Sequence, residues 1–310
     1  MDRFGREVRP LVLVCYRRSV GRAPFTGRRA KMQSNRKEYL KNFPKLRLKR
    51  QGFHFASAAG THVGCRRRGN EDSYLTLTRG NQHLYVVSDG MGGYAGGALA
   101  SRLVVQEFAF SLLTRLEALG PNQSPAVIDT LLRSSVTAAA EEVAYQATCL
   151  PQFEHMGATL TALLMIGDVA YLTHVGDSRA YLIRDEEITQ VSEDHSWVQH
   201  QVNLNWLSPE DARFHPRRNI ILRSISASSL DELTPDIAVI PLQRGDRFLL
   251  CSDGLNEHVF DEEMLAITQN KSREGAIREL VALANQRGGS DNSTVVLVEV
   301  KGKHGSKRAA

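Results

Sequence analysis

The sequence predicts an α+β fold in which one sheet packs on another and helices cover the outside. Two observations favour it: strand-like runs come in groups, and helix-like segments come in pairs. A third is the dipeptide Gly167-Asp168, which separates two strand-like runs as a two-residue hairpin would. With 310 residues and no internal repeat, the chain is long enough to bury one large core.

Turn residues and the spacing of apolar residues predict the individual strands and helices. Strands are expected at residues 53–61, 73–78, 83–88, 158–166, 169–175, 181–183, 188–191, 237–240, 247–251 and 295–300. Two helices should follow residue 93, with a break at Pro121–Pro125, and two more should span 262–267 and 274–285. The second helix carries its apolar or small face at Ile128, Leu131, Ser135 and Ala139.

Residues 195–222 are polar and mixed, and they interrupt the strand pattern. We expect an inserted helical flap there, with Trp197 and Trp206 packing within it and His195 as a structural residue at its base. The folded domain as a whole should span residues 51–300.

Charge is distributed unevenly along the chain. Residues 1–50 contain 16 Lys and Arg against three acids, and residues 301–310 contain four Lys and Arg, whereas residues 51–300 contain 19 basic and 31 acidic residues. We therefore expect a basic, disordered extension at 1–50, an acidic body, and a basic tail at 301–310. Met32 is an alternative start of the protein.

The basic extension lacks the interleaved aromatics and the helical face of a nucleic-acid-binding segment. No firm nucleic-acid or membrane partner is expected, although the arm could contact an acidic surface. The four cysteines form no disulfide or zinc pattern, and the apolar run 11–16 is too short to span a bilayer. We expect a cytoplasmic monomer.

The stretch 83–93 organises the rest of the chain. An apolar run ends on Asp89, and Gly90, Met91, Gly92 and Gly93 then turn the chain. Such an end leaves a carboxylate at the rim of a sheet beside a backbone carbonyl, that of Gly90, which a ligand can approach closely. Oxygen donors of this kind suit a hard cation.

A dinucleotide site is the alternative, since Gly90, Gly92 and Ala95 match G-x-G-x-x-A. That site also needs an acid about 20 positions on, at the end of a strand. The only acid within reach is Glu107, which lies within a helical repeat, and Asp89 would repel a pyrophosphate. A plain structural turn is the other alternative.

Further acids stand where strands stop or start, which argues against a plain turn. They lie in Asn70-Glu71-Asp72, Gly176-Asp177-Ser178-Arg179, Ser252-Asp253-Gly254 and Ser290-Asp291-Asn292. Acids gathered at strand ends repel one another unless cations neutralise them, and oxygen-only donors favour Mg²⁺ or Mn²⁺ over zinc.

The chain resembles the metal-dependent type 2C protein serine/threonine phosphatases in their bacterial form. The resemblance runs from about Phe53 to Val300 and covers these motifs in order: Arg67-x-x-Asn70-Glu71-Asp72, Asp89-Gly90-Met91-Gly92-Gly93, Met156-Gly157-Ala158-Thr159-Leu160, Val175-Gly176-Asp177-Ser178-Arg179-Ala180-Tyr181, Asp194-His195-Ser196, Arg218-Asn219-x-x-x-Arg223, Gly245-Asp246-x-x-Leu249-Leu250-Cys251-Ser252-Asp253-Gly254-Leu255 and Asp291-Asn292-x-Thr294-Val295.

The resemblance implies a four-layer α-β-β-α sandwich, two antiparallel sheets flanked by helix pairs, with two Mn²⁺ or Mg²⁺ ions at one end. Asp89 would bridge both ions, and Asp253 and Asp291 would complete the first. Glu71 and the Gly90 carbonyl would hold the second, with Asp72 binding its water. Asp177, with Asp253, matches a third, weaker metal position, and Arg67 would hold the substrate phosphate.

The implied activity is hydrolysis of phosphoserine and phosphothreonine by a metal-bridging hydroxide. Met91 stands where eukaryotic members have a proposed general-acid histidine. The expected partners are a Ser/Thr kinase and its phosphorylated substrates, in signal transduction. The alternatives are a phosphatase of a partner-switching regulator and a non-catalytic phosphoprotein-binding scaffold.

One departure from the family pattern is Thr61-His62-Val63-Gly64, where bacterial members carry Ser/Thr-Asp-x-Gly. We expect His62 to be a packing change and not a new metal ligand.

Overall fold

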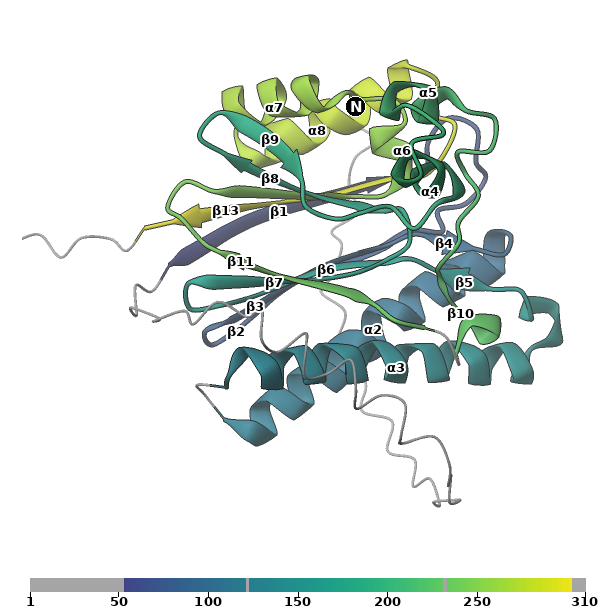
Figure 1. Cartoon of the computed structure of the whole chain (residues 1–310), viewed down its shortest axis with the longest axis horizontal. Helices are drawn as coiled ribbons and strands as arrows, with labels where there is room; N and C mark the ends of the chain where they lie inside the picture. The colour runs from purple at the N-terminus through teal and green to yellow at the C-terminus, as the bar shows by residue number, and fades with distance from the viewer. Residues whose placement is uncertain (1–52, 121–122, 231–232, 303–310) are drawn as a thin grey trace, which may run out of the picture. The chain divides into compact units, whose positions relative to one another are not determined.

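Two five-stranded antiparallel sheets lie between two layers of helices in the computed structural model of the chain (Figure 1). The structure describes residues 53–120, 123–230 and 233–302, all within one unit, Leu46–Ala310. The expected basic extension, residues 1–50, and residues 303–310 of the tail lie outside the described residues. Within residues 53–120, 123–230 and 233–302, no helix has the length and apolar character needed to span a bilayer.

The strand order of the first sheet is β1-β13-β12-β8-β9, and that of the second is β11-β7-β6-β3-β2. The first sheet contains β1 (His54–His62), β8 (Arg179–Arg184), β9 (Glu187–Gln190), β12 (Arg247–Cys251) and β13 (Ser293–Lys301). The second contains β2 (Ser73–Arg79), β3 (Gln82–Ser88), β6 (Leu160–Ile166), β7 (Val169–Val175) and β11 (Asp236–Pro241). A small third sheet is formed by β4 (Gly90–Met91), β5 (Gly157–Ala158) and β10 (Ile225–Ser226).

Helices cover the outer face of each large sheet. The second sheet is covered by α2 (Tyr94–Leu119) and α3 (Pro125–Cys149), and the first by α6 (Asp253–Asn256), α7 (Asp261–Asn270) and α8 (Arg273–Gln286). Segment 195–222 holds α4 (Trp197–Asn203) and α5 (Pro209–Phe214), and short 3₁₀ turns lie at Pro151–Phe153 and Ala227–Ser229. Serines cap several helix starts: Ser272 Oγ, for example, accepts from the Gly275 amide at 3.1 Å.

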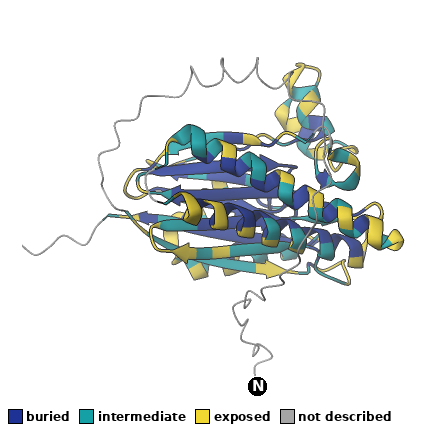
Figure 2. Cartoon of the chain, turned by 90° about the horizontal axis from the view of Figure 1, so that it is seen from below, coloured by how far each residue is buried: buried dark blue, intermediate teal, exposed yellow. Residues whose placement is uncertain are grey.

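Three hydrophobic clusters separate the four layers. One lies between α2, α3 and the second sheet, one between the two sheets, and one between the first sheet and α6–α8. Successive residues of β3 point alternately into the two clusters on its faces. Leu84 and Val86 face the α2–α3 side, whereas Tyr85 and Val87 face the other sheet. This explains why β3 is apolar from Leu84 to Val87, and Figure 2 shows the buried band that results.

The predicted fold class is confirmed, and the strands begin and end within about two residues of the sequence expectation. Two local differences stand out. The expected strand 158–166 is interrupted at Thr159, whose hydroxyl and amide both bind the backbone of Asp89. A short helix that the sequence analysis did not expect, α6, follows β12 and begins at Asp253 itself.

The register brings acidic strand ends to one edge in each sheet. In the second sheet Val87 pairs with Thr161, and Leu160 pairs with Val175, so the ends of β3 and β7 flank the start of β6. In the first sheet Cys251 pairs with Val295, so the end of β12 meets the start of β13. The carboxylates that follow or precede these ends can therefore meet.

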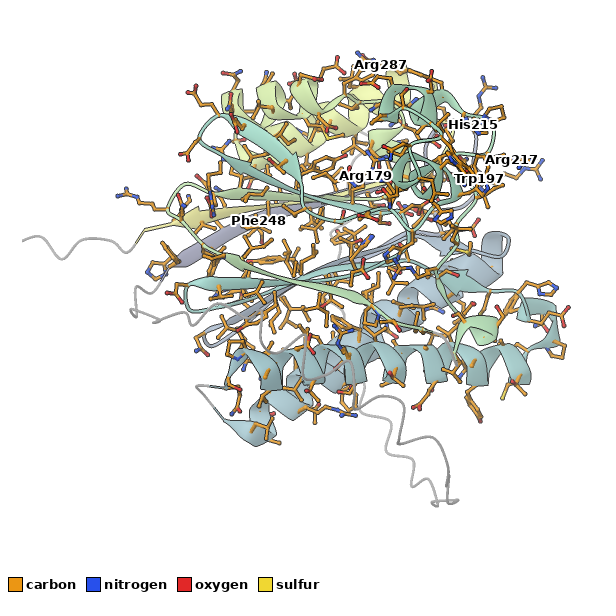
Figure 3. All side chains as sticks on the ribbon, in the orientation of Figure 1. Arg179, Trp197, His215, Arg217, Phe248 and Arg287 are labelled. Carbon is orange, nitrogen blue, oxygen red and sulfur yellow. The ribbon has the colours of Figure 1, made fainter. Side chains whose placement is uncertain are left out.

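The layer between the sheets supplies a test of the fold. Phe248 is fully buried there (Figure 3). Phe248→Ala should lower the free energy of unfolding by roughly 3–5 kcal/mol, because it removes apolar contacts and leaves a cavity. Urea unfolding measures this, with Phe110→Ala as control: Phe110 is 51% exposed on α2, and its loss should change stability by about 0.5 kcal/mol or less. Equal losses in the two variants would contradict the packing.

Candidate active site

A cluster of acidic side chains lies at the end of the sandwich where β3, β7 and β12 stop and β13 starts. Burial raises the pKa of the Asp89 carboxyl well above its usual range, and repulsion from the carboxylates of Asp72, Asp253, Asp177 and Asp291 raises it further. The structure thus brings together five of the acids predicted from sequence, from segments up to 219 residues apart.

Three other members of the cluster, Asp253, Asp177 and Asp72, also have a raised pKa. The pKa of Asp253 also lies well above its usual range, through burial and then repulsion from Asp177. Burial and the neighbouring Asp194 raise the pKa of Asp177 to about 7. Burial raises that of Asp72 to about 6, although the hydroxyl of Ser252 donates to its Oδ2 at 2.7 Å.

The Glu71 carboxylate and the Gly90 carbonyl oxygen both lie against α2 at Gly97. A side chain at Gly97, in the first turns of that helix, would collide with Glu71 Oε2 and would approach the Gly90 carbonyl oxygen to 2.8 Å. Only glycine at position 97 leaves both oxygens room. The Glu71 carboxylate is itself fixed through its backbone, because the Glu71 amide donates to Asn292 Oδ1 at 2.7 Å.

Asn292 connects the two acidic segments that border the site. Its side chain is buried; besides accepting from Glu71, its amide group donates to the carbonyls of Val63 and Gly69, at 2.9 and 3.0 Å. The loop that carries Arg67 is therefore tied to the residue that follows Asp291.

Arg67 reaches the acidic cluster directly. Its Nη2 donates to Asp291 Oδ2 at 2.5 Å, and its side chain remains 42% exposed. Burial opposes its charge, but the carboxylates of Asp291, Glu71 and Asp253 together raise the pKa of the guanidinium. The group stays charged, with part of its donor set facing outward.

The residues present fit divalent cations by their donor chemistry. All proposed donors are oxygens, and Asp72 Oδ1, Asp177 Oδ1 and Asp253 Oδ1 are buried without a hydrogen-bond partner. In the segments that the structure describes, no three acidic, histidine or cysteine side chains already stand as a ligand set around one point.

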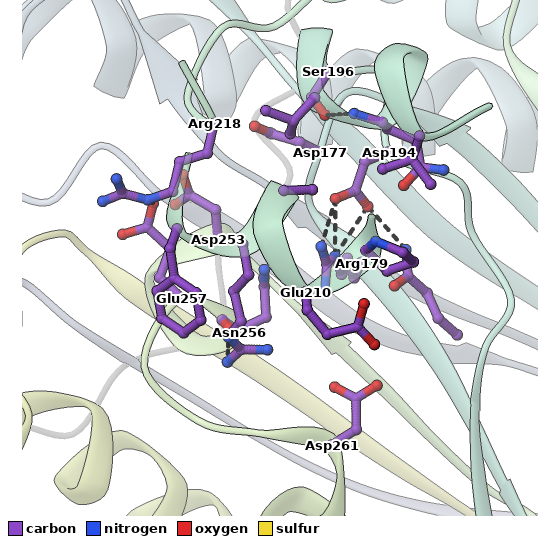
Figure 4. A pocket seen from close by; sticks show the side chains of 18 of the residues that line it. Asp177, Arg179, Asp194, Ser196, Glu210, Arg218, Asp253, Asn256, Glu257 and Asp261 are labelled. Atoms are coloured by element: carbon purple, nitrogen blue, oxygen red, sulfur yellow. Dashed lines mark hydrogen bonds and ion pairs between the residues drawn. The ribbon is translucent and has the colours of Figure 1, made fainter. Parts of the chain in front are cut away.

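A cavity of about 400 Å³ opens beside Asp177 and Asp253 and runs between segment 195–222 and helices α6–α7 (Figure 4). Its arginines are engaged: Arg179 binds Asp194, and Arg218 binds Glu257. Within the flap Trp197 packs against His215 with ring centroids 5.1 Å apart (Figure 3). Trp206 is 75% exposed, so the expectation that it packs within the flap was wrong.

His62 caps a turn. Its Nδ1 accepts from the Gly64 amide at 2.9 Å, which a carboxylate at this position could also do, and it contacts Asn285 Nδ2 at 3.1 Å. This agrees with the expected packing role. Sequence reasoning did not give a role to Gly97, Thr159 or Asn292; the last two lie in motifs quoted above, whereas nothing in the sequence distinguished Gly97.

Comparison with known proteins decides the family. Residues 60–290 match the family described as protein phosphatase 2C. The chain belongs to this family. The predicted resemblance is thus confirmed.

Curated relatives in the family are bacterial. The chain is 37% identical over 243 residues to the serine/threonine protein phosphatase PstP of Mycobacterium tuberculosis, covering 78% of this chain and 44% of PstP, so it spans less than half of that relative. It is 35% identical over 241 residues to the serine/threonine phosphatase stp of Listeria monocytogenes, covering 77% of this chain and 93% of stp.

Solved structures share the fold. The PstP catalytic domain in complex with two manganese ions matches with a TM-score of 0.69 and 36% identity, over 80% of this chain and 99% of that one. The serine/threonine phosphatase Stp1 of Staphylococcus aureus matches with a TM-score of 0.74 and 31% identity, over 84% of this chain and 100% of Stp1.

The cluster predicts opposite effects of one substitution with and without metal. Asp89→Asn removes a buried like charge, so near neutral pH the metal-free variant should be more stable than the unsubstituted protein. Mn²⁺ at about 100 times its Kd should stabilise the unsubstituted protein by roughly 2.7 kcal/mol and the variant far less.

Thermal unfolding with EDTA and with Mn²⁺ measures both effects. Glu141→Gln, on the exposed side of α3, is the control and should match the unsubstituted protein in both conditions. An Asp89→Asn variant that gains as much from Mn²⁺ as the control would contradict a metal site at Asp89.

Proposed function

We propose that this chain is a Mn²⁺- or Mg²⁺-dependent phosphatase that hydrolyses phosphoserine and phosphothreonine in proteins. The observation that carries the proposal is the gathering of five repelling carboxylates from five strand ends, in a chain of the protein phosphatase 2C family. Such a cluster is unfavourable by itself and becomes favourable with bound cations. The PstP catalytic domain, crystallised with two manganese ions, supports the same centre here.

The residues would share the ions as follows. Asp89 would bind both, Asp253 and Asp291 would complete the first site, and Glu71 with the Gly90 carbonyl would form the second. Asp72 would orient a water molecule of that second site. Asp177, which borders Asp253 and has an unpartnered buried oxygen, offers a third position with it.

When bound, a pair of divalent ions supplies an acidic water for attack and charge to hold the phosphoryl oxygens. The guanidinium of Arg67 would bind the phosphate as a planar fork and orient it for in-line attack. Met91 offers no proton, so the leaving hydroxyl takes its proton from water. Cys251 is fully buried and burial raises its thiol pKa, so it does not serve as a nucleophile.

The substrates would be phosphorylated proteins, in line with the names of the relatives PstP, stp and PhpP. A cognate Ser/Thr kinase, a role in signal transduction, a cytoplasmic location and a monomeric state are part of this proposal. A partner-switching phosphatase would use the same site. The acidic set argues against the scaffold alternative, because Glu71, Asp89, Asp253 and Asp291 are all present.

Hydrolysis of a phosphothreonine peptide with Mn²⁺ tests the proposal. Asp89→Asn should lower kcat/KM roughly a hundredfold or more, because it weakens both metal sites. Arg67→Ala should lower it about tenfold or more, mainly through KM, because a charge-assisted phosphate contact is lost. Arg68→Ala, an exposed neighbour, is the control and should be unchanged.

The origin of the new oxygen tests direct attack by water. A single turnover in ¹⁸O-water should label the released phosphate and leave the protein unlabelled. Peptide binding without turnover in the unsubstituted protein would favour the scaffold, and a phosphorylated intermediate would contradict direct attack.

A further inference from the structure

His195 lies at a junction between the acidic cluster and segment 195–222. Its side chain is 1% exposed, and it is the first residue of the flap predicted from sequence. Both of its backbone groups and both of its ring nitrogens are engaged, each with a different part of this region. The imidazole makes two of these contacts, and the His195 backbone makes the other two.

The first set of contacts fixes the turn before Asp177. The His195 amide donates to the Gly176 carbonyl at 2.7 Å, and the Gly176 amide donates to His195 Nδ1 at 3.1 Å. Gly176 itself has φ +112° and no room for a side chain, because a Cβ would collide with Thr159. His195 therefore binds both backbone polar groups of a residue that only glycine fits.

The second set closes the base of the flap. The His195 carbonyl accepts from the Leu222 amide at 2.7 Å, the Trp197 amide donates to the Ile220 carbonyl at 2.8 Å, and Ser196 pairs with Ile221 in a β-bridge. Segment 195–222 thus begins and ends side by side, joined at His195.

The ring contacts specify one tautomer. Because an amide can only donate, Nδ1 must be an unprotonated acceptor, and the proton of the neutral ring lies on Nε2. There it donates to Asp236 Oδ2 at 3.0 Å, while Asp236 Oδ1 accepts from Arg223 Nη1 at 3.1 Å. Asp236 anchors the ring to the start of β11 and orients it toward Gly176.

The position of the Asp177 carboxylate depends on the His195 contacts, because the carboxylate has little hydrogen-bonding support of its own. The side chain is 6% exposed, and Oδ1 has no hydrogen-bond partner. Its direction follows from the backbone of the turn, which His195 holds on one side. On the other side, Ser178 Oγ forms a hydrogen bond with Thr159 Oγ1 at 2.7 Å. Thr159 Oγ1 also accepts from the Asp89 amide at 2.9 Å.

We propose that His195 is a positioning residue that holds the Gly176–Asp177 turn and joins this turn to the base of the flap. The Asp177 carboxylate and the flap are thereby held in a fixed position relative to each other. The effect of His195 on catalysis rests on the proposed phosphatase function, whereas its effect on the turn does not. The inference is therefore tested in the metal-free protein first.

Two substitutions separate the two ring contacts. His195→Gln can still donate from the Nε2 position to Asp236 but lacks an acceptor near Gly176, whereas His195→Asn retains an acceptor at the Nδ1 position and loses the donor to Asp236. His200→Gln, exposed on α4 of the same flap, is the matched control.

Amide hydrogen exchange by NMR is the primary measurement. In His195→Gln, exchange at Gly176 and Leu222 should rise together by roughly tenfold, the equivalent of one lost hydrogen bond, with β3 unchanged. In His195→Asn and His200→Gln, exchange at Gly176 should stay within about twofold of the unsubstituted protein. The Mn²⁺ concentration for half-maximal thermal stabilisation should rise in His195→Gln alone.

Equal exchange at Gly176 in the Gln and Asn variants, or a rise spread evenly over the whole fold, would overturn the proposal. The unsubstituted protein gives a second test that needs no variant. The ¹⁵N spectrum of His195 should show Nδ1 unprotonated, with a coupling through the hydrogen bond to the Gly176 nitrogen; a protonated Nδ1 would overturn it. Absence of phosphatase activity would defeat the proposed function but would leave these readouts intact.

Discussion

Repulsion between buried carboxylates is the constraint on which the active end of this protein depends. Burial raises the pKa of Asp89, Asp177 and Asp253, and the carboxylates of Asp253 and Asp177 raise that of Asp89 further. Left alone, such a group favours protonation or separation of the strand ends that carry it. The rest of the sandwich resists separation, because β3 and β12 are each buried by hydrophobic clusters on both faces. Divalent cations are the natural complement of a charge cluster that cannot move apart.

Small uncharged groups hold these charges in place. Asn292 fixes the backbone of Glu71 and of the Arg67 loop, Thr159 fixes that of Asp89, and Ser252 binds Asp72. None of these contacts neutralises a carboxylate, and Asp72, Asp177 and Asp253 each keep one carboxylate oxygen without a hydrogen-bond partner. His195 extends the same arrangement from the Asp177 turn to the flap. Rigid backbone with available oxygens is what a metal-binding catalytic centre needs.

The sequence indicated the layers and most of the site for clear physical reasons. Strand periodicity and paired helices predicted the sandwich, and Asp-Gly dipeptides after apolar runs marked Asp89 and Asp253. What the sequence could not give depends on contacts across the fold. Gly97 looks like any helical glycine until Glu71 and the Gly90 carbonyl pack against it. The strand breaks at Thr159 because this residue binds the backbone of Asp89, and the helix that starts at Asp253 was not expected from the sequence. The role of His195 follows only from its contact with Gly176.

Anomalous scattering from manganese, measured on crystals of this protein grown with Mn²⁺, tests the central claim most directly. The account predicts two strong peaks at the end of the sandwich, both in contact with Asp89, one bordered by Asp253 and Asp291 and the other by Glu71 and the Gly90 carbonyl. Peaks elsewhere, or ordered carboxylates of Asp89, Asp253 and Asp291 with no manganese between them, would contradict it.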